Sequence, residues 1–299
     1  MTLCISNQYR SLGDGRPTAF CYSDSLLTTL GSKNCKIDAG AFLLSNAEIK
    51  HQTTKGIKIH IVSAVTNGRQ STRDFVFSIA GAVPLGLQSL IHLDSVFKTF
   101  YGNYSFEEYI ERAERTLCEF WKDAWDKDIE YLITAADDDS QIKIIHIKGT
   151  VSNLEINEVQ PEYELLFGVI GDSAEEAREK IKQETNSLMC AGIEIYSALD
   201  MACIRMIRRA VEDPNQIFIG GSIQSCLLRG GDAQYLTLDD GKHLMYRGVE
   251  YPKEYNKSIN RAPSPSMDIA QDIYNPQINI QEIIEIIENL ELYEDESTD

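Results

Sequence analysis

The order in which strand and helix patterns follow one another constrains the fold of this chain most. Alternating or continuous short apolar runs predict strands over 2–9, 18–23, 57–66, 74–80, 129–136, 141–148, 163–170, 222–229 and 234–238. Apolar residues at helical spacing predict helices over 84–101, 105–126, 173–185 and 187–212. This series buries all its apolar faces when two sheets lie between two helix pairs. The sequence therefore predicts an α+β protein, a four-layer α/β/β/α sandwich of two antiparallel sheets.

The size and charge of the chain exclude some classes of partner. Its 299 residues, 43% of them hydrophobic, are enough to bury a sizeable core. The net charge of −18 argues against binding to nucleic acids or anionic membranes, because both attract basic surfaces. We find no apolar run of transmembrane length and no signal-peptide pattern at the N-terminus. We therefore expect a cytoplasmic protein that contacts neither nucleic acid nor membrane.

The potential metal ligands are scattered along the chain. Its seven cysteines and five histidines show no ligand spacing, so we expect reduced, buried thiols and no metal site. The acidic run Asp137-Asp138-Asp139 is interpreted as a solvated hairpin turn. Neither a Walker A loop nor a GxGxxG motif occurs, so the sequence predicts no cofactor.

The first five residues, Met1-Thr2-Leu3-Cys4-Ile5, offer a candidate nucleophile. A small residue after the initiator methionine allows aminopeptidase to remove Met1, which would leave Thr2 at the N-terminus. Thr2 would then carry a hydroxyl and an α-amine with a reference pKa of about 7.7–8.0, so the amine can act as the base. Nucleophile and base would come from one residue, without a histidine.

The order of several short motifs resembles the N-terminal nucleophile hydrolases, and among them most closely the proteasome β-subunit family and its bacterial relatives. The resemblance covers roughly residues 1–240. The matching motifs are Met1–Ile5 opening a strand, Ser23-Asp24-Ser25 closing the second strand, the Lys-Ile-His-Ile strand from Lys58, Ala80-Gly81, Val169–Ala177 and Ile219–Cys226. Membership would imply a threonine peptidase or amide hydrolase acting on a peptide or protein.

The resemblance assigns a role to each of four residues. Thr2 would be the nucleophile, and Asp24 would orient both Thr2 and a lysine. Lys58 would be the cation that lowers the pKa of the Thr2 hydroxyl, and the Gly81 N–H would stabilise the oxyanion. Lys36 is the alternative cation, because it lies nearer to the family's Asp-to-Lys spacing. We prefer Lys58, because an Asn-Gly hairpin joins its strand to the strand that ends at Gly81.

The sequence also departs from the family pattern. Asp172 stands where the family often has a serine, and Gln216 and Ile219 stand where it has an aspartate and a serine that support the terminal amine. The segment between Asp24 and Lys58 is long, and a retained Met1 would block the amine. One alternative is therefore a non-catalytic, proteasome-like structural subunit.

A second alternative is a cysteine-dependent amidase. Cys4 lies on the strand face opposite to Leu3 and Ile5, so its thiol could face a site.

The C-terminal segment looks like an addition to the domain. We assign residues 1–250 to the hydrolase-like domain and 251–299 to a proline-containing linker, a short amphipathic helix over 279–292 and an acidic tail. That helix is too short to be stable alone. Since the family forms rings or stacked arrays, we expect a homo-oligomer and a regulatory partner.

Overall fold

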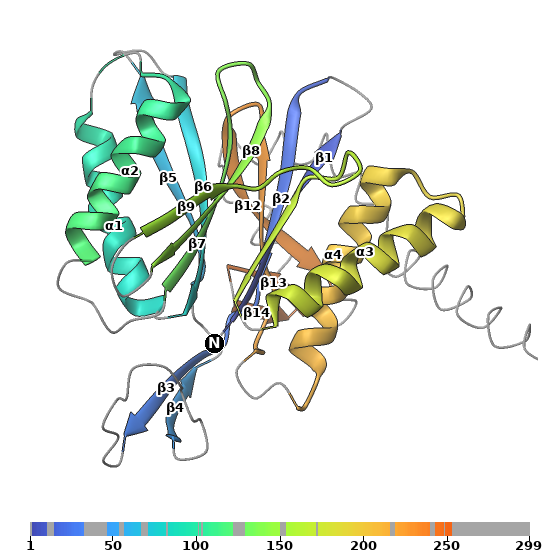
Figure 1. The fold of residues 1–299 in the computed structure, drawn as a ribbon. Coiled ribbons are helices and arrows are strands. Elements are labelled where there is room, and N and C mark those ends of the chain that lie inside the picture. Colours follow the sequence, from blue (N-terminus) through green and yellow to red (C-terminus); the bar gives the residue numbers. More distant parts are fainter. Residues whose placement is uncertain are drawn as a thin grey trace, which may run out of the picture.

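The computed structural model describes residues 2–10, 15–32, 47–53, 57–66, 71–81, 83–100, 102, 104–121, 129–149, 154–171, 173–215, 219–239, 243–247 and 249–252. Within these ranges two large antiparallel sheets pack face to face, and a helix pair covers the outer face of each (Figure 1). The predicted α+β class with two antiparallel sheets and paired helices is confirmed.

The first sheet contains the start of the chain. Its seven strands lie in the order β10 (Phe167–Gly171), β1 (Leu3–Arg10), β2 (Pro17–Ser23), β11 (Gln224–Arg229), β12 (Asp232–Asp239), β13 (His243–Tyr246) and β14 (Val249–Pro252). Helices α3 (Ala174–Cys190) and α4 (Ile195–Glu212) cover its outer face. The N-terminal strand β1 is therefore second in this sheet and pairs with β10 on one side and β2 on the other.

The second sheet has five strands, in the order β5 (Ile59–Thr66), β6 (Ser71–Gly81), β7 (Ile129–Ala136), β8 (Ile142–Gly149) and β9 (Leu154–Glu158). Helices α1 (Val83–Thr99) and α2 (Phe106–Trp121) cover its outer face. The start of α2 has the predicted capping box: Ser105 Oγ accepts from the Glu108 N–H at 3.2 Å, and Glu108 Oε2 accepts from the Ser105 N–H at 2.7 Å.

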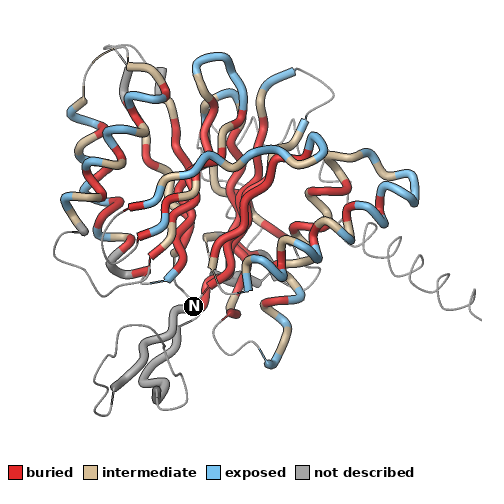
Figure 2. The backbone as a smooth tube through the Cα atoms, in the orientation of Figure 1, coloured by how far each residue is buried: buried red, intermediate tan, exposed pale blue. Residues whose placement is uncertain are grey.

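Three apolar clusters hold the layers together, and Figure 2 shows the burial concentrated along the strands. One joins α3 and α4 to the first sheet and includes Leu3 and Ile5. The second joins α1 and α2 to the other sheet and includes Tyr109. The third lies between the sheets and includes Cys4 and Leu132. Alternation along β1 therefore sends consecutive side chains into two different cores, as the sequence predicts for Cys4.

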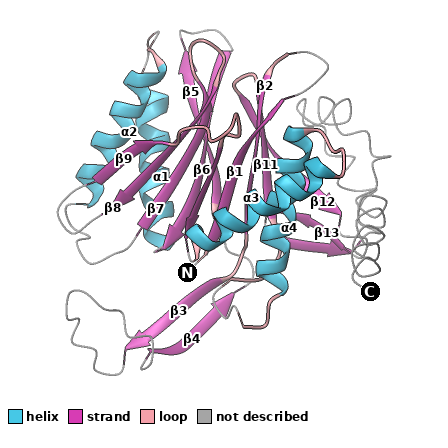
Figure 3. Ribbon diagram, turned by 45° about the vertical axis from the view of Figure 1, so that its right-hand side comes forward, coloured by secondary structure: helices cyan, strands magenta, loops and turns pink. Residues whose placement is uncertain are grey.

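The structure corrects several predicted boundaries. Strands β9, β13 and β14 were not predicted, and β3 (Leu27–Ser32) pairs with β4 (Ala47–Thr53) in a separate small sheet outside the sandwich (Figure 3). The predicted helix end near 185 is wrong, because α3 continues to Cys190. It stops where Gly192 adopts φ 88° and its N–H bonds to the Met189 carbonyl. Ser173 precedes α3 but makes no side-chain cap.

Two further predictions concern the whole chain. No helix in the described ranges combines the length and the apolar composition that a membrane span requires. Strands β13 and β14 extend the first sheet to Pro252, and the predicted helix over 279–292 lies outside the described residues. The division into 1–250 and 251–299 therefore stays a prediction.

Candidate active site

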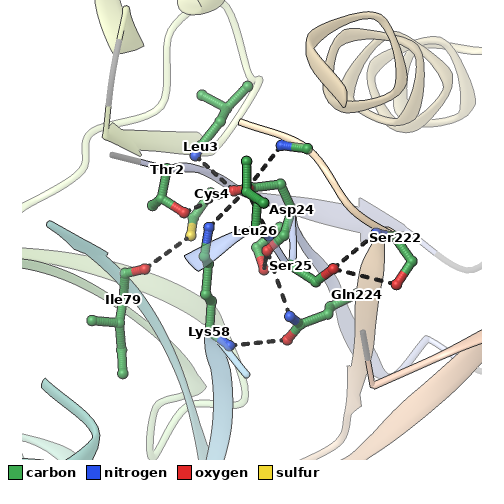
Figure 4. A network of polar contacts seen from close by, with 12 residues as sticks. Thr2, Leu3, Cys4, Asp24, Ser25, Leu26, Lys58, Ile79, Ser222 and Gln224 are labelled. Carbon is green, nitrogen blue, oxygen red and sulfur yellow. Dashed lines mark hydrogen bonds and ion pairs between the residues drawn. The ribbon is translucent and has the colours of Figure 1, made fainter. Parts of the chain in front are cut away.

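Asp24 brings the beginning of the chain into a polar site. It follows β2 directly, and the β1–β2 register pairs Cys4 with Ser23, so Thr2 and Leu3 lie beside the Asp24 carboxylate. The Thr2 hydroxyl donates to Asp24 Oδ1 at 2.7 Å, and the Leu3 N–H donates to the same oxygen at 3.1 Å (Figure 4). The hairpin therefore places the candidate nucleophile on the candidate orienting carboxylate.

Lys58 reaches the other oxygen of the same carboxylate from the second sheet. Its Nζ lies 2.7 Å from Asp24 Oδ2, and both side chains are fully buried. A buried ion pair is tolerated when hydrogen bonds complete its shell, and it becomes costly when one partner is removed. Asp24 thus links the Thr2 hydroxyl to a buried positive charge.

Backbone amides complete the environment of the carboxylate. The N–H groups of Leu26 and Gly220 donate to Asp24 Oδ2 at 3.2 and 3.3 Å. With the Leu3 N–H and the side chains of Thr2 and Lys58, donors surround both oxygens, which is how proteins stabilise an ionised carboxylate away from water. The position of the Asp24 carboxylate is therefore fixed by donors from its own loop and from three other segments, at residues 2–3, Lys58 and Gly220.

Lys58 differs in detail from the prediction. It immediately precedes β5 instead of lying within the strand predicted over 57–66, and it is fully buried. Its carbonyl accepts from the Ile79 N–H of β6 at 2.9 Å, whereas its own N–H donates to Gln224 Oε1 at 3.0 Å. An exposed strand lysine is excluded.

Gly81 and Gly171 end strands near Thr2. Gly81 closes β6 with φ 84°, opposite Ile129. A Cβ at Gly171 would lie 1.9 Å from the Thr2 carbonyl oxygen and 3.5 Å from Ala80 Cβ, so Thr2 and the residue before Gly81 both lie close to Gly171. The role of the Gly81 N–H as an oxyanion donor stays a prediction.

Four more residues were compared with the family pattern, and the structure describes one of them. Lys36, Asp172 and Gln216 lie outside the described residues. Ile219 is buried in the core between α4 and the first sheet.

The site also contains residues that sequence reasoning missed. Ser25 Oγ accepts from the Ser222 N–H at 2.8 Å, and the two hydroxyl oxygens lie 3.4 Å apart. Gln224 contacts the backbone of both Asp24 and Lys58. The available signal was two polar residues, Ser222 and Gln224, at the start of the strand predicted over 222–229.

The thiol of Cys4 is poorly placed for nucleophilic attack. Burial raises its pKa well above the ordinary value, although Lys58 opposes that shift, and its Sγ donates to the Ile79 carbonyl at 3.4 Å. A thiol held protonated between two sheets is a weak nucleophile. Elsewhere in the described part of the chain, no group of three or more His, Cys, Asp or Glu side chains is arranged to hold a metal ion.

Comparisons with known proteins show which structures share this fold. No family model and no curated protein matches the chain. An Anbu (Gly-1) mutant from Hyphomicrobium sp. strain MC1 aligns with a TM-score of 0.52 and 10% identity over 91% of this chain and 97% of its own. Anbu from Yersinia bercovieri, described as an ancestral β-subunit, aligns with a TM-score of 0.50 and 13% identity over 80% and 88%. The Anbu complex of Pseudomonas aeruginosa, a helical assembly, gives a TM-score of 0.47 and 12% identity over 91% and 96%.

These comparisons correct the sequence-based assignment. Assignment to the proteasome β-subunit family is wrong, because the two similar structures with TM-scores of 0.52 and 0.50 are Anbu proteins. Short Ser, Asp and Gly motifs mark strand ends and turns in any chain of this layered shape, so they reported the fold more reliably than the family. Identities of 10% and 13% show a common fold and leave the chemistry to the residues of the site. In fold, the chain is similar to the Anbu structures.

Proposed function

We propose that this protein is a threonine peptidase or amidase that cleaves amide bonds in a peptide or protein, with Thr2 as the attacking residue once Met1 is removed. The carrying observation is the buried Asp24 carboxylate, which binds the Thr2 hydroxyl and the Lys58 ammonium at the same time. A desolvated charge pair beside a hydroxyl adds little to the stability of a core. The same pair can activate a hydroxyl nucleophile, which must lose its proton to react.

The proposed reaction begins with removal of Met1. The freed α-amine of Thr2 takes the hydroxyl proton as Oγ1 forms a bond to the substrate carbonyl carbon. The carbonyl π electrons move to oxygen, and the Gly81 N–H stabilises this oxyanion. When the intermediate collapses, the C–N bond breaks and the leaving amine takes the proton from the Thr2 ammonium. Water then hydrolyses the ester, which releases the acid and restores Thr2.

Asp24 and Lys58 have separate tasks in this scheme. The Lys58 positive charge favours the deprotonated form of the neighbouring hydroxyl, because an opposite charge stabilises a developing anion. Asp24 holds the Thr2 hydroxyl and the Lys58 ammonium in one geometry, which reduces the entropic cost of reaching the transition state.

The test is covalent labelling with an electrophile directed at N-terminal threonines, read by intact mass and N-terminal sequencing. Thr2→Ala is expected to abolish both labelling and amide cleavage, whereas Thr2→Ser retains labelling. Loss of one hydrogen bond to a charged group costs about 1.5–3 kcal/mol, less than the roughly 5–15 kcal/mol by which folded proteins are typically stable, so the fold persists. Thr185→Ala is the matched control, because Thr185 is equally buried and its hydroxyl donates to the Ile181 carbonyl within α3. Labelling that survives in Thr2→Ala would place the nucleophile elsewhere.

A non-catalytic structural subunit is the second candidate, because the Thr2 side chain is fully buried. This candidate requires Met1 to remain in the purified protein. Intact mass separates the two: a retained Met1 together with the absence of labelling supports the structural role.

A further inference from the structure

Gln224 connects the two halves of the candidate site. It opens β11, where it pairs with Ser23, and its side chain lies between Asp24 and Lys58 (Figure 4). Oε1 accepts the Lys58 N–H at 3.0 Å and the Ile59 N–H at 3.4 Å. Nε2 donates to the Asp24 carbonyl at 3.5 Å. One side chain of the first sheet therefore holds the backbone at both ends of the Asp24–Lys58 ion pair.

The chemistry of this position favours a primary amide. The two backbone N–H groups need an acceptor, and the Asp24 carbonyl, which accepts from Ser23 Oγ at 3.1 Å, also takes a second donor. Glutamine supplies both, a carboxylate lacks the donor, and a hydrocarbon side chain lacks both. A buried N–H left without a partner costs about 1–3 kcal/mol, so replacement of Gln224 would make the Lys58 segment move toward another acceptor.

We propose that Gln224 is a positioning residue, which fixes the backbone of Lys58 relative to Asp24 and so holds the lysine charge in place beside Thr2. This inference rests on the proposed function. The hydrogen bonds of the Gln224 side chain to Lys58, Ile59 and Asp24 all go to backbone groups, so the proposed role acts through the position of this backbone.

The first test compares Gln224→Met with Ser225→Ala. Met is of similar size and removes every hydrogen bond of the amide. Gln224→Met is expected to lower kcat about 100-fold with KM unchanged, because a displacement of about 1 Å in a catalytic group has effects of that size. Ser225 is the adjacent buried residue of β11 and donates to the Leu236 carbonyl, away from the site. Ser225→Ala is expected to keep wild-type kcat.

A second readout does not depend on catalysis. Amide hydrogen exchange at Lys58 and Ile59 is expected to accelerate in Gln224→Met, because both N–H groups lose their acceptor. It is expected to stay protected in Ser225→Ala and in Thr2→Ala. Wild-type protection of both amides in Gln224→Met would overturn the proposal.

Gln224→Glu provides a conservative rescue with a distinctive pH profile. Its ionised carboxylate directs a second oxygen at the Asp24 carbonyl, and the two repel each other. Once protonated, it donates a hydrogen bond as the amide does. The ratio of variant to wild-type kcat is therefore expected to rise as pH falls. A merely structural loss would leave this ratio independent of pH.

The outcomes separate the two proposals. Equal loss of kcat in Gln224→Met and Ser225→Ala, or a pH-independent ratio in Gln224→Glu, overturns the positioning role. Cleavage that persists in Thr2→Ala overturns the proposed function instead. In that case the exchange of the Lys58 and Ile59 amides still decides whether Gln224 holds this segment.

Discussion

At the scale of single residues, Lys58 and Asp24 depend on each other because neither side chain reaches water. Lys58→Ala leaves a buried carboxylate without its counter-charge, and removing one partner of such a pair costs about 3–5 kcal/mol. The N–H groups of Leu3, Leu26 and Gly220 still hold Asp24, so we expect a value near the lower end. Urea unfolding measures this loss, and cleavage is expected to fall nearly as far as in Thr2→Ala.

Lys36→Ala is the matched control for this prediction. It removes the same type of side chain at the position that the sequence offered as the alternative cation, and we expect little change in stability or cleavage. If Lys36→Ala abolished cleavage while Lys58→Ala did not, the two lysines would have to exchange roles.

At the scale of secondary-structure elements, the pairing of β1 with β10 brings the Thr2 backbone close to Gly171. Gly171 has φ 101°, and an added Cβ would meet the Thr2 backbone, which cannot move without moving β1. Gly171→Ala is therefore expected to destabilise the protein and to abolish labelling of Thr2. Gly192→Ala is the control, because Gly192 has φ 88° with nothing within 4 Å, so only backbone strain of about 1–2 kcal/mol is added. Equal effects in labelling and chemical unfolding would contradict this account.

The contact between α4 and the first sheet predicts a pH dependence. Burial raises the pKa of Asp200 to about 6, although hydrogen bonds from Tyr22 and Asn7 oppose the shift. The folded state therefore binds this proton more tightly than the unfolded state, whose pKa is about 3.9. The free energy of unfolding should fall as pH rises between these two values, by at most about 1.4 kcal/mol per pH unit, and then level off.

Asp200→Asn tests the pH dependence because it keeps the acceptor oxygen and removes the ionisation. Urea unfolding across the same pH window is expected to show a shallower slope and higher stability at neutral pH than the wild type. An unchanged slope would assign the pH dependence to other groups.

At the scale of the whole molecule, the expected homo-oligomer stays a prediction. Ile280, Ile283, Ile284, Ile287 and Leu290 form one apolar face in the sequence of 279–292, a segment outside the described residues. Light scattering at micromolar concentration is expected to show an oligomer that Ile284→Asp dissociates. Gln281→Asp adds the same charge on the polar side and is expected to leave the oligomer intact. A monomeric wild type would contradict the prediction.

The sequence by itself determined the fold class and the pair of candidate site residues that lie on one hairpin, Thr2 and Asp24. Periods of 2 and 3.6 in the apolar residues depend only on local geometry, so the element order led to two sheets between helix pairs. The β1–β2 hairpin is also local, and it brings Thr2 to Asp24. The periodicity of apolar residues does not show where a helix is capped, so the end of α3 before Gly192 was missed. It also did not reveal the edge strand β9.

The tertiary structure decided everything that crosses between layers. Lys58 meets Asp24 from the other sheet, and Gln224 reaches the Asp24 carbonyl across 200 residues of chain. Gly171 limits Thr2 only because β10 pairs with β1. The pattern along a strand specifies which side chains face inward, and the packing of one sheet on another specifies which of them meet. That register arises from the fit of whole surfaces, so no single stretch of sequence contains it.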